Sequence, residues 1–219
     1  QKMQKFFYYP GDVMVRGAYP NFARKIWREL DLDQTFFDED KEILKEGKVD
    51  FFTYSYYSTS CHTTHAGAKR DGGGNLSLGY CNEYIPYSEW GWGMDPDGLR
   101  YSLNELYDRY QVPIMVVENG LGAIDKLENG EVHDPYRIDY MRAHVEAMAE
   151  AIDDGVDLIA YTPWGCVDLV SASSGEMRKR YGMIYVDIDD EGKGTLNRYR
   201  KDSFYWYKKC IASNGENLD

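Results

Sequence analysis

Apolar positions along the chain alternate between strand and helix spacing, beginning with an aromatic run at residues 49–57 that is typical of a buried strand. Asp95-Pro96 then supplies a helix cap and a proline at the first helical position. Residues 114–117, directly after Pro113, run apolar without alternation, which favours a parallel strand covered on both faces. The helix between these strands has an apolar stripe at steps of four, three and four, formed by Leu99, Leu103, Leu106 and Tyr110.

A second unit repeats this pattern. Asp134-Pro135 predicts the start of a long helix that ends near Gly155, and residues 156–161 predict a third strand. We expect a last helix over residues 201–212, and two more helices before the first strand, near residues 21–30 and 38–45. The expected apolar faces are Ile138, Met141, Val145, Met148 and Ile152 on the long helix, and Phe204, Tyr207 and Ile211 on the last one.

Strand–helix alternation of this kind indicates an α/β fold built from parallel βαβ units. Only three strands are visible, whereas a closed (β/α)₈ barrel needs eight strands and about 250 residues. We therefore expect residues 1–219 to form a single domain that is incomplete as a fold. The glycine-rich residues 71–75 are interpreted as a surface loop.

Composition and charge narrow the classes of function. With 25 basic and 37 acidic residues the net charge is −12, which argues against a nucleic-acid or acidic-membrane partner. Residues 1–5 lack the apolar segment of a secretory signal. The chain's cysteines have no zinc-site or disulfide-framework spacing. We therefore expect a soluble cytoplasmic protein with reduced thiols and with neither a metal nor a cofactor; the cysteines are Cys61, Cys81, Cys166 and Cys210.

Glu118 is the first candidate for chemistry. It follows four apolar strand residues, at the carboxyl end of a strand, where parallel α/β folds gather their ligand sites. A carboxylate is costly to desolvate there without partners, and the position suits a nucleophile or general base. Capping a helix or pairing with an arginine is the alternative, and spacing alone does not decide between them.

The segment Val116-Val117-Glu118-Asn119-Gly120 resembles the nucleophile signature of glycoside hydrolase family 1. Residues 50–57 resemble the sixth barrel strand of that family, residues 92–100 the segment leading to its seventh helical element, and residues 151–168 the eighth. The resemblance covers nearly the whole chain. It implies the C-terminal part of a (β/α)₈ TIM barrel, strands six to eight with their helices, and retaining hydrolysis of a β-glycosidic bond.

By this resemblance Glu118 is the nucleophile, Tyr57 orients it through a hydrogen bond, and Trp164 forms part of the sugar subsite. For Tyr57 and Trp164, packing in the core is the alternative. The family's acid/base glutamate lies in an Asn-Glu-Pro tripeptide, which this chain does not contain. We therefore expect the missing N-terminal half of the barrel as a partner and an isolated chain that is inactive. A homo-oligomer is the other way to cover its strand edges.

The residues after Trp164 suggest which sugar is bound. Members acting on free sugars have Glu and Trp where this chain has Ser171 and Ala172, while Ser171, Lys179 and Tyr181 match the phosphate-binding set of the family's 6-phospho-β-glycosidases. The basic run at residues 178–180 could equally be a solvated charged surface.

The resemblance implies a 6-phospho-β-glucoside as substrate, such as phosphorylated cellobiose or an aryl or alkyl β-glucoside. Ala172, in place of a Trp, favours the gluco epimer, although a 6-phospho-β-galactosidase or a dual 6-phospho-β-glycosidase stays open. An inactive sugar-phosphate-binding fragment and a structural or interaction protein are further alternatives.

Overall fold

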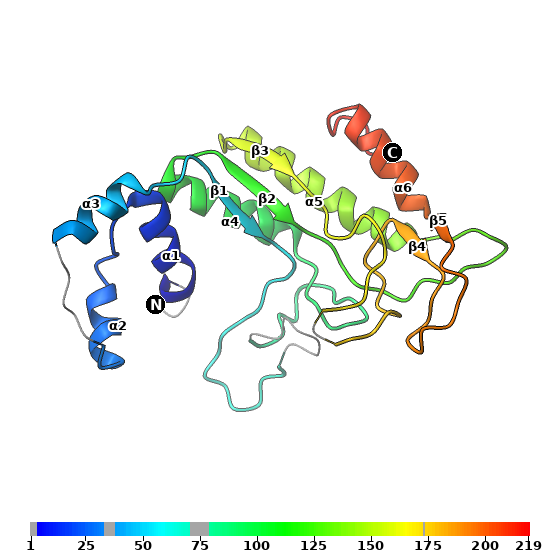
Figure 1. Ribbon diagram of the computed structural model, residues 1–219, viewed down its shortest axis with the longest axis horizontal. Helices are drawn as coiled ribbons and strands as arrows, with labels where there is room; N and C mark the ends of the chain where they lie inside the picture. The colour runs from blue at the N-terminus through cyan, green and yellow to red at the C-terminus, as the bar shows by residue number, and fades with distance from the viewer. Residues whose placement is uncertain (1–3, 33–37, 71–78, 173) are drawn as a thin grey trace.

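The computed structural model describes residues 4–32, 38–70, 79–172 and 174–219 (Figure 1). Its centre is a parallel sheet in the order β1 (Phe52–Ser55), β2 (Ile114–Glu118) and β3 (Leu158–Tyr161). Helix α4 (Pro96–Tyr110) follows β1, and α5 (Pro135–Asp153) follows β2. The predicted βαβ pattern is therefore confirmed. The glycine-rich residues 71–75, predicted as a surface loop, lie outside the described residues.

Helices at the two ends of the chain flank this sheet. The N-terminal ones lie at one end of the molecule in Figure 1, and they include the two expected before β1 and an unpredicted helical stretch over residues 4–16. No helix among the described residues is both long and apolar enough to cross a bilayer. The remaining helices are η1 (Gln4–Tyr8), α1 (Tyr9–Gly11), η2 (Asp12–Arg16), α2 (Ala23–Glu29), α3 (Asp38–Glu46) and α6 (Asp202–Ala212).

Sequence reasoning missed one small sheet. Strands β4 (Ile184–Val186) and β5 (Arg198–Arg200) pair antiparallel just before α6. Both are only three residues long, and β5 alternates arginine with tyrosine, so neither gives the apolar run by which the longer strands were recognised.

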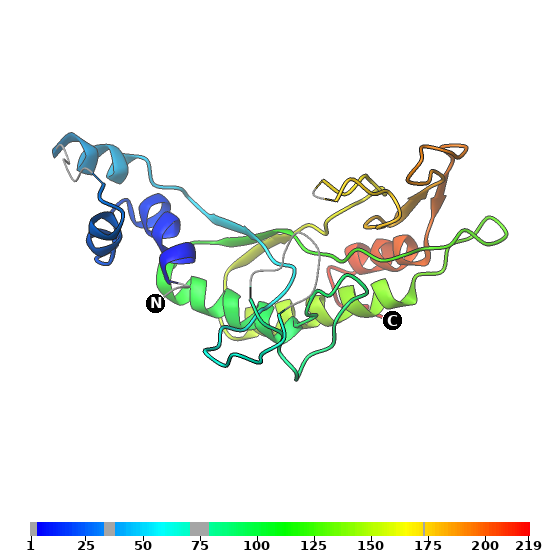
Figure 2. The same cartoon turned by 90° about the horizontal axis from the view of Figure 1, so that it is seen from below.

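The main core lies between the sheet and its helices. Figure 2 shows α4 and α5 lying along one face of the three strands. The predicted apolar stripe of α4 is fully confirmed, and it packs against Ile114 and Val116 of β2, which have no exposed surface. The predicted cap is also confirmed, because the Asp95 carboxylate accepts a hydrogen bond from the Gly98 amide at 3.0 Å.

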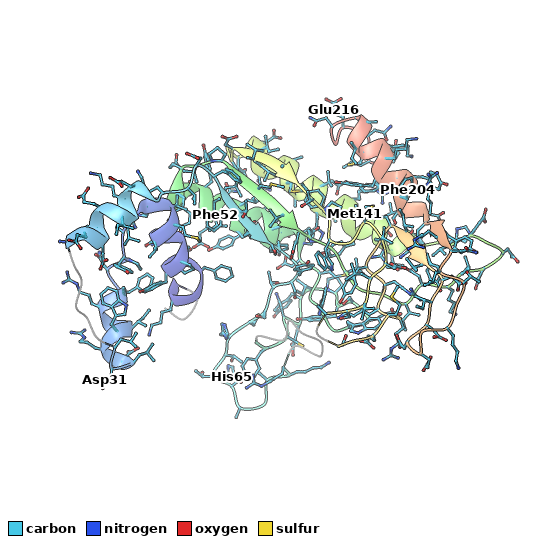
Figure 3. All side chains as sticks on the ribbon, in the orientation of Figure 1. Asp31, Phe52, His65, Met141, Phe204 and Glu216 are labelled. Atoms are coloured by element: carbon cyan, nitrogen blue, oxygen red, sulfur yellow. The ribbon has the colours of Figure 1, made fainter. Side chains whose placement is uncertain are left out.

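The predicted faces of the other two helices are partly wrong. Ile152 of α5 is 50% exposed and Ile211 of α6 is 63% exposed. The buried face of α5 instead contains polar side chains such as Arg137 and His144. A search for apolar periodicity cannot find such positions, since a polar side chain is buried readily where it has hydrogen-bond partners, as Arg137 has in Asp134 and the Leu121 carbonyl. A second cluster forms between α5 and α6, where Figure 3 labels Met141 and Phe204.

The sheet is not covered equally on its two faces. Along β2, Ile114 and Val116 are buried, whereas Met115 and Val117, which point to the opposite side, are half-buried. On β3, Ile159 is 53% exposed. The expectation that residues 114–117 of β2 are covered on both faces is therefore wrong for the described residues. An apolar face of the sheet remains open to solvent.

A buried network of charges fixes the loops that follow the strands. The Lys201 ammonium lies 2.5 Å from Asp125 and 2.8 Å from Asp168, and all three side chains are fully buried. Arg137 bonds Asp134 at 2.9 Å and Asp125 at 3.2 Å. These residues come from the loops after β2 and β3 and from the starts of α5 and α6, so the network ties four segments to one point. Asp134 is the N-cap residue of α5, as the sequence predicts, but its side chain bonds Arg137 and Ser203 and makes no hydrogen bond to the first turn of the helix backbone.

Replacing the central cation of this network should destabilise the protein strongly. Lys201→Met keeps a long apolar stem but leaves two buried carboxylates without their closest cation, and we expect a loss of about 3–5 kcal/mol in the free energy of unfolding. Denaturant titration of the purified protein measures this loss. Lys208→Met, at an exposed position of the same helix, should change it by less than about 0.5 kcal/mol. Equal stability of the two variants would contradict the assignment.

Candidate active site

The carboxylate of Glu118 lies at the carboxyl end of β2, next to the end of β1. The hydroxyls of Ser55 and Tyr57 both donate to its Oε2, at 2.9 Å and 3.0 Å. A register shift after Tyr54 pairs Ser55 with Glu118, which brings these side chains to the same face. Among the hydrogen bonds between described residues, none engages Oε1. One oxygen of the carboxylate is thus fixed, and the other is available for chemistry.

Tyr57 acts here as a hydrogen-bond donor. Burial raises the pKa of its phenol well above the ordinary value, and the adjacent Glu118 carboxylate raises it further. The phenol therefore stays protonated across the physiological pH range and keeps donating to the carboxylate. The structure thus brings together the two side chains that sequence reasoning paired.

Asn119 ties the ends of all three strands together. Its buried side-chain amide donates to the Tyr56 carbonyl at 2.8 Å and to the Tyr140 hydroxyl of α5 at 3.0 Å. Its Oδ1 accepts from the Tyr161 hydroxyl at the end of β3, also at 3.0 Å. Because Asn119 directly follows Glu118, these bonds fix the backbone from which the carboxylate projects. Sequence reasoning assigned no role to this residue.

Trp164 follows β3 and is held close to the same point. Its backbone amide donates to the Asn119 carbonyl at 2.7 Å, and its ring meets the edge of the Tyr181 ring at a centroid distance of 6.4 Å. Gly165 next to it has φ +89°, and a Cβ there would lie 3.0 Å from Tyr181. Only glycine fits that position without displacing Tyr181. Trp164 is half-buried, which leaves part of it open to a ligand.

Ser171, Lys179 and Tyr181, which we call the serine–lysine–tyrosine cluster, converge in the loop between β3 and β4. The hydroxyls of Ser171 and Tyr181 are 3.1 Å apart, and the Lys179 ammonium lies 5.6 Å from the centre of the Tyr181 ring. All three side chains are buried. The structure therefore brings together the three residues that were predicted as one site. Ala172, beside Ser171, is exposed.

The three basic residues of the run have different partners. Arg178 bonds Glu176 at 2.8 Å, and Arg180 donates to the backbone carbonyls of Val186 and Ile188 at 2.9 Å and 2.7 Å. The Lys179 ammonium is buried without a hydrogen-bond partner among the described residues. The surface-charge alternative is thus wrong for Lys179 and Arg180, which are both buried.

Aromatic rings surround the Lys179 ammonium. It lies 4.5 Å from the ring centre of Trp92 and 5.5 Å from that of Trp90. Burial lowers the pKa of this ammonium, while the nearby Glu176 carboxylate opposes that shift. Cation–π contacts offset only part of the desolvation cost of an ammonium. An anion with several oxygens would supply the hydrogen bonds that Lys179 lacks.

Trp92 joins the two parts of the site. Its ring meets that of Tyr57 edge-on at a centroid distance of 5.6 Å and lies 6.4 Å from that of Tyr181. Its buried Nε1 has no partner among the described residues. The carboxylate and the serine–lysine–tyrosine cluster are thus connected through Tyr57 and Trp92. Together they can hold a ligand with a reactive centre at one end and an anionic group at the other.

Three contributors were missed by sequence reasoning: Ser55, Asn119 and Trp92. Ser55 stands two residues before Tyr57, so strand alternation could have placed it on the same face. Trp92 was noted only as part of the segment before α4. Its contacts join β1 to the loop after β3, and nothing in its local sequence indicates that long-range contact.

Comparison with known proteins agrees with this geometry. The model of glycosyl hydrolase family 1 matches residues 1–216. The chain is 52% identical over 225 residues to an aryl-phospho-β-D-glucosidase of Bacillus subtilis strain 168, covering 100% of this chain and 46% of that protein. It is 53% identical over 213 residues to a 6-phospho-β-glucosidase of Clostridium longisporum, covering 95% and 45%.

A solved structure is similar over the same extent. The family 1 β-glucosidase from Thermotoga maritima matches with a TM-score of 0.79 and 29% identity, covering 98% of this chain and 46% of that one. The chain thus spans about half the length of the curated relatives it matches.

The Asn119 amide should contribute measurably to stability. Asn119→Ala leaves the Tyr56 carbonyl and the hydroxyls of Tyr140 and Tyr161 without this partner, and we expect the free energy of unfolding to fall by about 3 kcal/mol. Denaturant titration measures the change. Asn197→Ala, at an exposed position, is the matched control and should be neutral within about 0.5 kcal/mol. If both variants are equally stable, the amide does not hold the strands together.

Proposed function

The chain belongs to glycosyl hydrolase family 1, and from this premise we propose that it carries the nucleophile and the phosphate site of a retaining 6-phospho-β-glucosidase. Its three parallel strands are part of a (β/α)₈ barrel. The observation that carries the proposal is the pairing of a held carboxylate, Glu118, with a buried cation, Lys179, that lacks a hydrogen-bond partner among the described residues.

Glu118 attacks the anomeric carbon of the sugar in this proposal. Ser55 and Tyr57 hold Oε2, which aims the carboxylate and leaves Oε1 to form the glycosyl–enzyme bond. The leaving group departs with a proton as this bond forms. Water then attacks the anomeric carbon, breaks the bond to Glu118 and gives a proton to the group that had protonated the leaving group, so the sugar is released with its original configuration. Trp164 offers its ring to the C–H face of the sugar, as aromatic side chains in sugar subsites do.

The proton for the leaving group has to come from a second carboxyl group, about 5–5.5 Å from the nucleophile in retaining enzymes. The hydrogen-bond partners of Glu118 among the described residues are the hydroxyls of Ser55 and Tyr57, and neither is a carboxyl group. We therefore propose that the acid lies on barrel strands that the longer relatives carry and this chain does not. Those strands would also cover the open face of the sheet; self-association is the alternative. A cytoplasmic location is proposed as well, and the four free thiols support it.

The serine–lysine–tyrosine cluster would receive the 6-phosphate. Hydroxyl groups donate to phosphate oxygens, and the Lys179 ammonium supplies the positive charge. The names of the two relatives above, an aryl-phospho-β-D-glucosidase and a 6-phospho-β-glucosidase, support a phosphorylated β-glucoside such as phosphorylated cellobiose or an aryl β-glucoside. The small Ala172 side chain supports the gluco epimer, with dual acceptance of gluco and galacto substrates as the alternative.

Removing the nucleophile should abolish turnover. Glu118→Gln in the full-length protein keeps the size and the acceptor oxygen of the side chain but cannot form the covalent intermediate, and kcat should fall by several orders of magnitude. Release of nitrophenol from a 6-phospho-β-glucoside measures this. Glu146→Gln, at an exposed position of α5, should retain full activity. A near-normal kcat for Glu118→Gln would rule out its role.

Removing the cation should affect only phosphorylated substrates. Lys179→Ala should raise KM for a 6-phospho-β-glucoside about tenfold or more, because a charge-assisted bond to the phosphate is lost. Hydrolysis of the unphosphorylated glucoside should change little, and the exposed Lys193→Ala serves as the control. An equal effect on both substrates would refute the phosphate site.

A further inference from the structure

Glu176 lies beside the serine–lysine–tyrosine cluster and accepts hydrogen bonds from one of its members and from two residues next to it. Its Oε1 accepts a hydrogen bond from the Trp90 indole at 3.2 Å, and its Oε2 accepts one from Arg178 at 2.8 Å. Its backbone carbonyl accepts from the Ser171 amide at 3.0 Å. Glu176 therefore joins the loop before α4, which carries Trp90, to the loop that carries Ser171.

A carboxylate next to an anion site would normally weaken anion binding by repulsion. Here Arg178 forms an ion pair with Glu176 at 2.8 Å and also lies 3.6 Å from Asp190, so it offsets the charge of Glu176 only in part. The Glu176 carboxylate also opposes the fall in the pKa of Lys179 that burial causes, which keeps that cation protonated but does not itself attract an anion. The useful contribution of Glu176 is therefore its hydrogen bond to Trp90.

The Trp90 ring restricts the Lys179 side chain. Its ring centre lies 5.5 Å from the Lys179 ammonium, which also contacts the rings of Trp92 and Tyr181. A lysine side chain has many rotamers, and fixing it on ligand binding costs conformational entropy. A lysine already confined by three rings loses less of that freedom when it binds. The Lys179 methylenes also pack closely against Gly122, where an added Cβ would lie 2.7 Å from two of them. The Lys179 side chain is therefore confined on that side as well.

We propose that Glu176 is a positioning residue of the phosphate site: its hydrogen bond holds the Trp90 ring against Lys179 and so prepares the ammonium to receive the sugar phosphate. The inference rests on the proposed 6-phospho-β-glucosidase function. Glu176 itself does not touch the substrate.

Two substitutions of Glu176 separate its hydrogen bond from its charge. Glu176→Gln removes the charge but keeps an acceptor for the Trp90 indole, whereas Glu176→Ala removes both. The readout is the ratio of kcat/KM for a nitrophenyl 6-phospho-β-glucoside to that for the unphosphorylated nitrophenyl β-glucoside. In the full-length protein we expect Glu176→Ala to lower this ratio about tenfold, through KM. Glu176→Gln should keep it within about twofold.

A double-mutant cycle tests the partner. Trp90→Phe keeps an aromatic ring but removes the indole donor, so it should lower the ratio as Glu176→Ala does. The double variant should be no worse than either single variant, because both remove the same bond. Glu191→Ala, an exposed acidic position in the following loop, is the control.

Several results would overturn the inference. Glu176→Ala could leave the ratio unchanged, either with no effect on kcat/KM or with an equal fall in kcat/KM for both substrates, as a merely structural role would. Glu176→Gln could match Glu176→Ala, or the effects of the Trp90 and Glu176 variants could add. A wild-type protein with no preference for the phosphorylated substrate would refute the proposed function and this inference with it, whereas a wild-type preference that is retained in Glu176→Ala would refute the inference alone.

Discussion

The side chain of Asn119 makes the hydrogen bonds on which the geometry of the site depends. Parallel strands are joined only by their backbone ladders, and these ladders stop where the strands end. Just past that point the side chain of Asn119 bonds the Tyr56 carbonyl directly after β1, the Tyr140 hydroxyl of α5 and the Tyr161 hydroxyl at the end of β3. The bonds are buried, where an unpaired amide or hydroxyl would be costly, so the arrangement has little freedom to vary. These bonds position Glu118, which directly precedes Asn119, and Trp164, whose amide donates to the Asn119 carbonyl.

Two buried lysines show how a structural charge differs from a binding one. Lys201 and Lys179 both have no exposed surface. Lys201 bonds two carboxylates and is satisfied within the protein, so its charge holds loops together. Lys179 contacts aromatic faces, and its ammonium has no hydrogen-bond partner among the described residues. Burial disfavours such a cation, and a ligand anion would reverse that penalty. The same residue type thus stabilises the fold at one position and, under the proposed function, binds an anion at another.

The open face of the sheet bears on where the second carboxyl group of the proposed reaction lies. Ile159 is exposed there, and Glu118 projects from the same sheet with one oxygen free of hydrogen bonds to described residues. In a closed barrel both would face the interior, where further strands cover the apolar groups and bring other carboxylates near. Under the proposed function the site would be shared between two parts of a barrel, and this chain would supply Glu118 as the nucleophile and Lys179 as the cation.

The sequence by itself determined the three parallel strands, helix α4 with its buried stripe and Asp95 cap, and the family. It also paired Tyr57 with Glu118, and it grouped Ser171 and Tyr181 with Lys179. These follow from local periods and from ordered motifs. Only the tertiary structure decided which basic residue of the run at 178–180 lacks a partner, which face of α5 is buried, and that Ser55 and Trp92 belong to the site. Those facts depend on contacts between segments far apart in the chain. Burial and hydrogen-bond satisfaction are properties of such contacts, and no local pattern of residues encodes them.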